Sequence, residues 1–105
     1  MTDYPPTFIT LTETAAADTA FKLAVTDLWL EYADVFVYTN SAYMGSKKEQ
    51  NIAIYANDIY EFPYPINLAD LFFKNYTGGS NAVIVICGTT LTRKKAAEYG
   101  ITLPP

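Results

Sequence analysis

The chain has 105 residues, of which half are apolar and 17% are charged, with a formal net charge of −4, no His and one Cys. This composition predicts one folded domain with a hydrophobic core, and it excludes a disordered chain and an internal disulfide. The acidic balance disfavours a protein that tracks nucleic-acid phosphates, and the absence of His removes the commonest general base and zinc ligand.

The N-terminal residues predict an arm that lies outside the core. Pro5 and Pro6 lack amide hydrogens and fix φ, so residues 1–7 are expected to be extended, as a tail or as an arm lying on a neighbour. The start lacks the basic and apolar regions of a signal peptide, and no apolar run approaches the ~20 residues that cross a membrane. We therefore expect residues 8–105 to form a single β-rich domain with no membrane partner.

Short β-prone runs follow in chain order, with turn signals between them. Residues 12–19 indicate a loop or short helical turn, residues 40–51 a long turn and residues 77–80 a glycine turn, while Pro63 and Pro65 interrupt pairing. Only residues 93–99 indicate a helix, with Gly100 placed to cap it. Strands are expected at residues 8–11, 21–25, 28–30, 35–38, 52–55, 59–62, 71–73 and 83–87.

The run from Val83 to Cys87 is apolar at every position. A strand that is apolar on both faces is typical of the middle of a core, so Cys87 is expected to be a buried hydrophobe and not a nucleophile.

Two segments of the chain are weakly alike. Residues 27–31 and 70–74 each begin with Asp-Leu, and each precedes a loop and a Val-containing strand. Two similar hairpins would pack as a sandwich. The predicted fold class is mainly β: an antiparallel β-sandwich or barrel-like domain with a short C-terminal helix.

The acidic residues do not form a catalytic pattern. Asp58 and Glu61 are three apart in a strand-like segment, which points them to opposite faces. Asp27, Asp34 and Asp70 stand where strands are expected to begin, where Asp commonly shapes turns. No phosphate-binding loop and no activated nucleophile is present. We expect no catalytic, metal or cofactor-binding residues and no enzyme, although a carboxylate pair built from distant segments stays open.

Aromatic residues are the most unusual feature of the composition. Nine Tyr, six Phe and one Trp exceed what a core of this size holds, so several rings are expected at the surface or at an interface; Tyr is also simply a good strand former. Trp29 alternates with Leu28 and Leu30, so either the indole or the leucines face the core. The predicted interface residues are Tyr4, Pro5, Pro6, Phe8, Trp29, Tyr43, Tyr64, Tyr76, Arg93, Lys94 and Lys95.

Charge is distributed unevenly along the chain. Residues 1–70 carry ten acids and three bases, whereas residues 71–105 carry four bases and one acid. Such polarity favours recognition of a neighbour or head-to-tail contacts between copies. A solvated helix face is the simplest interpretation of Arg93, Lys94 and Lys95, followed by contact with an acidic surface.

A family resemblance rests on residues 66–85, INLADLFFKNYTGGSNAVIV, and on residues 34–40, DVFVYTN. Over residues 21–90 the chain resembles small virion proteins of tailed bacteriophages, in which an extended strand, a small-residue turn and a Val-rich closing strand follow one another. The resemblance implies a β-sandwich part of a capsid or tail, often a trimeric decoration or cement protein on the shell. It carries over no catalytic residue.

These observations lead to one main expectation and two alternatives. The main expectation is a non-enzymatic capsid decoration or cement subunit, located in the virion and assembled in the host cytoplasm. Its partners would be its own copies and a major capsid or other virion protein, with no nucleic acid, membrane or cofactor. The alternatives are a phage tail or fibre component and a carbohydrate- or receptor-binding β-sandwich.

Overall fold

Two antiparallel sheets form the fold, in a computed structural model that describes residues 6–15, 20–76 and 81–103. The elements are β1 (Phe8–Ala15), β2 (Trp29–Tyr38), β3 (Ala42–Gly45), β4 (Gln50–Ile54), β5 (Ile59–Phe62), β6 (Ile66–Asn67), the 3-10 turn η1 (Leu68–Asp70), β7 (Phe72–Asn75), β8 (Ala82–Thr90) and α1 (Arg93–Tyr99). The large sheet has the strand order β1-β8-β2-β5, with β6 also paired to β2, and the small sheet has the order β4-β3-β7.

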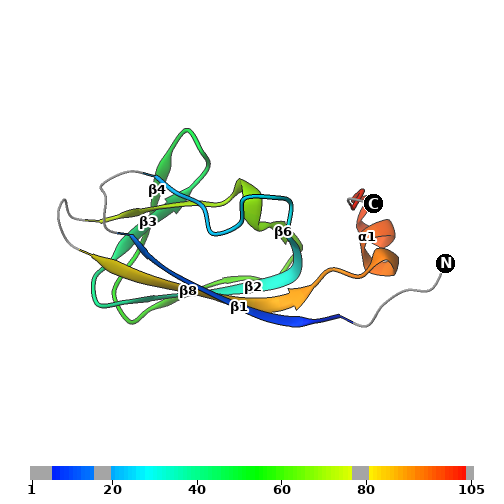
Figure 1. The fold of residues 1–105 in the computed structure, drawn as a ribbon, viewed down its shortest axis with the longest axis horizontal. Helices are drawn as coiled ribbons and strands as arrows, with labels where there is room; N and C mark the ends of the chain where they lie inside the picture. The colour runs from blue at the N-terminus through cyan, green and yellow to red at the C-terminus, as the bar shows by residue number, and fades with distance from the viewer. Residues whose placement is uncertain (1–5, 16–19, 77–80, 104–105) are drawn as a thin grey trace.

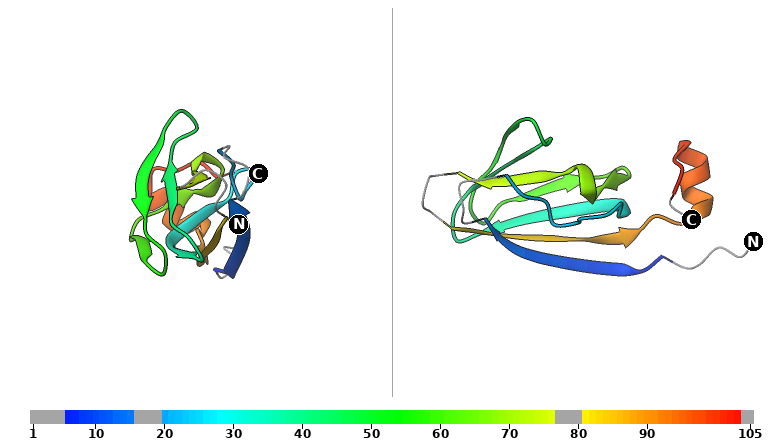
Figure 2. Two further views of the ribbon diagram at one scale, coloured as in Figure 1. Left: turned by 90° about the vertical axis from the view of Figure 1, so that its left-hand side faces the viewer. Right: turned by 45° about the horizontal axis from the view of Figure 1, so that its top comes forward.

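The two sheets lie one over the other along an elongated molecule of 49 × 25 × 18 Å. Figure 1 shows β3 and β4 at one end and α1 at the other, and Figure 2 shows β1, β8 and β2 running side by side along the long axis. Neither sheet closes on itself in the described part of the chain. The prediction of a mainly antiparallel β fold with a short C-terminal helix is therefore confirmed, in its sandwich form and not its barrel form.

Period-two alternation in the strands builds the core between the sheets. Every second residue is buried in β2 from Ala33 to Val37 and in β8 from Ala82 to Gly88, and β3 and β7 contribute Met44 and Phe73 from the opposite layer. Successive strand residues point to opposite faces, so one face of each sheet meets in the core. The largest fully buried side chains are Phe73, Leu30, Met44, Leu68, Ile84, Ile86, Val35 and Val37.

The apolar run at Val83–Cys87 forms the middle of β8, which pairs with both β1 and β2. Its central position is confirmed, but the expectation that both of its faces are buried is wrong. Ile84 and Ile86 face the core, whereas Val83, Val85 and Cys87 are only half-buried on the opposite face. Cys87 is therefore not a core residue, because no second layer covers this face of the large sheet in the described residues.

Two predicted strands, at residues 28–30 and 35–38, are in fact one. They join in β2 through an irregularity in the pairing between Leu30 and Tyr32. The predicted pair of similar hairpins is also wrong, since β7 pairs with β3 while β8 pairs with β1 and β2. Asp34 consequently lies in the middle of a strand and not at the start of one. A carboxylate is tolerated at this position because its side chain points away from the core.

The long turn predicted at residues 40–51 contains β3, so that prediction is wrong. Ala42 and Met44 alternate with Tyr43 and are fully buried, which the polar neighbours on either side obscure in the sequence. The connecting loop is short and closed by its own polar groups: the Glu49 N–H donates to Ser46 Oγ at 3.3 Å, and Gln50 Nε2 donates to the Ser46 carbonyl at 2.6 Å.

The strand predicted at residues 21–25 is reduced to one bridge. Phe21 exchanges two backbone hydrogen bonds with Phe73, at 2.9 and 2.8 Å, and no other residue of the segment pairs. This segment has only one β-branched residue, Val25, which is 84% exposed. The first strand, by contrast, is longer than predicted. It continues to Ala15, so residues 12–15 are strand and not the expected loop.

The remaining local predictions agree with the structure where it describes them. Strands are present close to residues 52–55, 59–62 and 71–73, and Pro63 and Pro65 separate β5 from β6. The helix at Arg93–Tyr99 is confirmed: Thr92 Oγ1 accepts from the Lys95 N–H at 3.2 Å, and Gly100 ends it at φ 70°. The glycine turn predicted at residues 77–80 lies outside the described residues.

Candidate interaction surfaces

The outer face of the large sheet is apolar over several strands. Ile59, Phe36, Val85 and Thr12 lie opposite one another in register, which places their side chains in one row across β5, β2, β8 and β1. Tyr38, Val83 and Thr14 form the adjacent row. These rows hold no charged residue, so they form a continuous apolar stripe.

This stripe is accessible to solvent. Ile59 is 52% exposed and Tyr38 is 43% exposed, and the Phe36 and Tyr38 rings stack at 6.3 Å with 4° between their planes. Figure 1 shows the small sheet and η1 on the other side of the large sheet, and no described element packs over the outer face. Exposed apolar patches of this kind mark interaction sites.

The row on the other side of the stripe is acidic. Glu61 of β5 lies directly opposite Asp34 of β2, and Asp34 lies opposite Cys87 of β8. In the part of the chain that the structure describes, neither carboxylate forms an ion pair. Burial raises the pKa of the Cys87 thiol above its ordinary value, and the Asp34 charge raises this pKa further. The thiol is therefore protonated at neutral pH and is a poor nucleophile.

Asp34 and Glu61 are a carboxylate pair built from distant segments, the case that the sequence left open once the pair of Asp58 and Glu61 had been set aside. Asp58 lies just before β5, in the connection from β4. Asp27 shapes the approach to β2 as expected, since its Oδ1 accepts from Asn67 Nδ2 at 3.0 Å. Among the described residues, no group of three or more Cys, Asp or Glu side chains is placed to hold a metal ion.

The outer face of the small sheet carries a cluster of tyrosines. The Tyr43 and Tyr76 rings stack with centroids 4.8 Å apart, and the Tyr55 ring lies 6.0 Å from Tyr76 at a steep angle. Lys74 lies opposite Tyr43 on the neighbouring strand, so its side chain shares this face. The cluster is amphipathic: its rings expose apolar faces and hydroxyl tips beside a cation.

A pocket of about 460 Å³ lies at the end of the same face. Lys22 Nζ sits 5.8 Å from the centroid of the Phe72 ring, a cation–π contact at the pocket wall. The lining residues come from the segment before β2, the β3–β4 loop, η1 and β7; they are Lys22, Ser46, Lys47, Ala69, Asp70 and Phe72.

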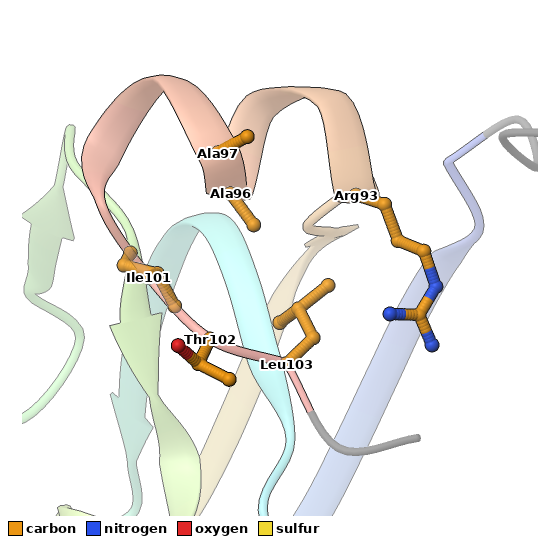
Figure 3. Close-up of a pocket in the computed structure, with 6 residues that line it drawn as sticks. All are labelled: Arg93, Ala96, Ala97, Ile101, Thr102 and Leu103. Atoms are coloured by element: carbon orange, nitrogen blue, oxygen red, sulfur yellow. The ribbon is translucent and has the colours of Figure 1, made fainter.

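A second pocket, of about 280 Å³, lies between α1 and the segment that follows it. Figure 3 shows residues 101–103 passing beneath the helix, with Ala96 pointing into the gap and Arg93 at its side. The walls are alkyl groups from both segments, with the Thr102 hydroxyl and the Arg93 guanidinium as polar groups. This pocket joins the helix to the chain end and holds no carboxylate or thiol.

The predicted interface residues fall on several separate surfaces. Tyr43 and Tyr76 come together on the small sheet, and Phe8, 61% exposed, lies at the margin of the large-sheet face. Trp29 is half-buried at the start of β2 while Leu30 is fully buried, which resolves the alternation in favour of Leu30 facing the core.

The other predicted residues lie on the periphery. Tyr64 is 54% exposed and contacts the Phe62 ring edge-on at 5.9 Å. Arg93, Lys94 and Lys95 are exposed on the first turn of α1, and Pro6 is exposed ahead of β1. Tyr4 and Pro5 lie outside the described residues.

Tyr43 and Tyr76 of the tyrosine cluster were identified from the sequence, but the residues that define the apolar stripe and the pocket were missed. Phe36, Val85 and Ile59 were assigned only to strands, although an apolar run on both faces of β8 signals an uncovered apolar face as well as a doubly buried one. Lys22 and Lys47 lie 25 positions apart in the sequence, and no spacing rule connects them. Their proximity depends on the Phe21–Phe73 bridge, which no local pattern predicts.

Comparison of the chain with protein-family models, with curated proteins and with solved structures gives no match. Within the described ranges, no helix has the length and apolarity needed to span a bilayer.

Proposed function

We propose that this protein is a non-enzymatic structural subunit that assembles through the outer face of its large sheet, as a capsid decoration or cement protein of a tailed bacteriophage. The observation that carries the proposal is the apolar stripe formed by Ile59, Phe36, Val85, Tyr38 and Val83, which spans three paired strands without a covering layer in the described residues.

The size of the face fits a contact with more than one neighbour. Four strands at about 4.8 Å spacing and eight paired residues at about 3.4 Å rise give at most about 500 Å² of flat area. A standard interface buries about 800 Å² on each partner. The face therefore supplies most of one interface, and a second contact with a copy or with the shell completes stable attachment.

The acidic row defines the chemistry of the partner. Burying Asp34 and Glu61 side by side without a counter-charge is unfavourable, because two desolvated like charges repel. We infer that the partner subunit offers an apolar patch flanked by a Lys or Arg that reaches this pair. The stripe supplies burial energy and the acidic pair sets the register of the contact.

The resemblance to phage virion proteins supports the finer assignment, since residues 21–90 include β2, β5 and β8, the three strands that carry the apolar stripe. A virion location and a major capsid protein as partner follow from that resemblance. A tail or fibre component is the close variant, because it uses the same kind of sheet face.

The assembly proposal is tested by measuring absolute mass by light scattering across a concentration series. We expect the chain to form a closed oligomer, such as a trimer, and Val85→Lys to yield monomers because the substitution places a charge in the centre of the stripe. Asn51→Lys, an exposed strand residue on the small sheet, is the matched control and should assemble normally. An oligomer unaffected by Val85→Lys would show that this face is not the contact.

The virion assignment is tested independently by mass spectrometry of purified phage particles from the host that carries the gene. Peptides of this chain should be present in fixed stoichiometry to the major capsid protein. Their absence from intact particles, together with a chain that stays monomeric and does not bind shells, would refute the assignment.

A further inference from the structure

The pocket at the end of the small sheet brings together two cations from distant parts of the chain. Lys22 lies on the segment before β2 and Lys47 on the β3–β4 loop, and both line the same cavity of about 460 Å³. Among the described residues, neither ammonium forms an ion pair. In a chain of net charge −4, a pocket lined by two cations and one carboxylate, Asp70, carries a local positive charge that favours an anion.

The Lys22 ammonium is held in place at this site. It lies 5.8 Å from the centroid of the Phe72 ring, whose negative face attracts a cation. Gly45 stands opposite Phe72, and an added Cβ there would clash with the Glu49 carbonyl, so the loop that carries Lys47 folds closely back on the end of β3. The loop backbone and the Lys22–Phe72 contact thus define two sides of the pocket.

Two further groups in the pocket recognise hydroxyls. Ser46 Oγ accepts a hydrogen bond from the Glu49 N–H, which leaves its own hydrogen to donate into the pocket. Asp70, the carboxylate in the lining, is an acceptor for ligand hydroxyl hydrogens. An inorganic phosphate or sulfate is repelled by the Asp70 carboxylate and has few or no hydrogens to donate to it. A hydroxyl-rich acid, in contrast, can contact the lysines, the serine and Asp70 together.

The tyrosine cluster extends this site along the sheet. Phe72 and Lys74 of β7 and Tyr76 directly after it alternate onto one face, so the strip from the pocket to the Tyr43–Tyr76–Tyr55 cluster is about 14 Å long. Aromatic faces beside polar tips accept the C–H faces of sugar rings while the hydroxyl tips bond their edges. An extended ligand with an acidic end therefore fits the arrangement better than a compact anion.

We propose that the outer face of the small sheet binds an acidic oligosaccharide, with its anionic group between Lys22 and Lys47, its hydroxyls on Ser46 and Asp70, and its following rings on the tyrosine cluster. This site lies on the opposite side of the sandwich from the assembly face and does not depend on the proposed role of that face. The anionic group is a carboxylate or a sulfate, and the experiment distinguishes the two with probes that carry only one of these groups each.

The proposal is tested by calorimetric titration of the full chain with galacturonic acid trimers, with their methyl esters, with a sulfated galactose trimer that has no carboxylate and with single-stranded DNA of similar length. We expect the uronate or the sulfated sugar to bind and the uncharged ester, which keeps the ring but not the charge, to bind at least tenfold more weakly. Raising the salt concentration should weaken binding of the charged sugar.

Matched variants locate the site. The double variant Lys22→Gln, Lys47→Gln should lose about tenfold in affinity, and Lys22→Arg with Lys47→Arg should retain binding with the fold unchanged. Lys48→Gln removes the neighbouring exposed cation that does not line the pocket and should have no effect. Tyr43→Ala should weaken trimers more than monosaccharides.

Three results would overturn the proposal. These are an affinity for both acidic sugars no higher than that for the methyl ester, an equal loss in Lys48→Gln and in the double variant, and tighter binding of single-stranded DNA than of either acidic sugar. The last of these would reassign the strip to nucleic acid. Each readout is a ligand affinity of the folded subunit, so none changes if the assembly proposal fails.

Discussion

Asp34→Asn should stabilise the isolated subunit, because it removes a like-charge pair that the fold creates. Asp34 lies directly opposite Glu61 on the outer face, with no ion pair to either carboxylate among the described residues. Cross-strand pairs of this kind change stability by roughly 0.2–1 kcal/mol. We expect a gain of about 0.5 kcal/mol in the free energy of unfolding, or about 3 °C in Tm for a domain of this size.

Thermal and urea unfolding of the monomeric protein measure this gain. The increase should shrink in high salt, since both groups remain partly exposed to solvent. Asp58→Asn removes one negative charge outside the row and is the control for net charge. The Asp34→Asn variant should also bring the Cys87 pKa closer to its ordinary value, because one of the two causes of its rise is lost. A destabilised Asp34→Asn subunit, or an equal gain in Asp58→Asn, would refute the cross-strand argument.

Three further predictions concern the strands that carry the outer face. Folding raises the Cys87 pKa, so above the ordinary thiol pKa the unfolded chain loses a proton that the folded chain keeps. The free energy of unfolding should therefore fall as pH rises from that value. Comparison with Cys87→Ala in urea melts isolates this pH dependence. Gly88→Ala should cost about 1–3 kcal/mol or more, since its Cβ would lie 2.1 Å from the Tyr32 carbonyl, and an unchanged Tm would contradict this close approach. Asn67→Ala should cost about 2 kcal/mol by leaving buried backbone donors without their side-chain acceptor, as circular dichroism melts would show.

The fold class was predictable because strand propensity is local. The β-branched and aromatic runs of β2 and β8, the capping pattern around α1 and the prolines after β5 are each contained within a few residues. Strand pairing was not predictable, because it depends on contacts between distant segments. The similarity of two sequence segments predicted that β7 and β8 form a hairpin, yet the two strands belong to different sheets.

The candidate surfaces were only partly predictable for the same reason. An excess of aromatic residues indicates exposed rings, and Tyr43 and Tyr76 were identified in this way. Their stacking requires β3 and β7 to pair, and β3 itself is hidden in a polar segment. The Asp34–Glu61 row likewise exists only through the register of β2 and β5. Composition thus indicates which residue types are exposed, and register decides which of them meet.

The two surfaces lie on opposite sides of the sandwich, so both should be occupied at the same time. The apolar stripe faces away from the core on the large sheet and the tyrosine strip faces away on the small sheet, with Phe73 and Ile84 packed between them. Assembly through the stripe should therefore leave the affinity of each subunit for an acidic trisaccharide unchanged. Titration of the assembled protein and of monomeric Val85→Lys, which differ on the large sheet only, measures this. Weaker binding in the assembled state would mean that assembly also buries the small sheet, and the partner would then contact the tyrosine cluster as well as the stripe.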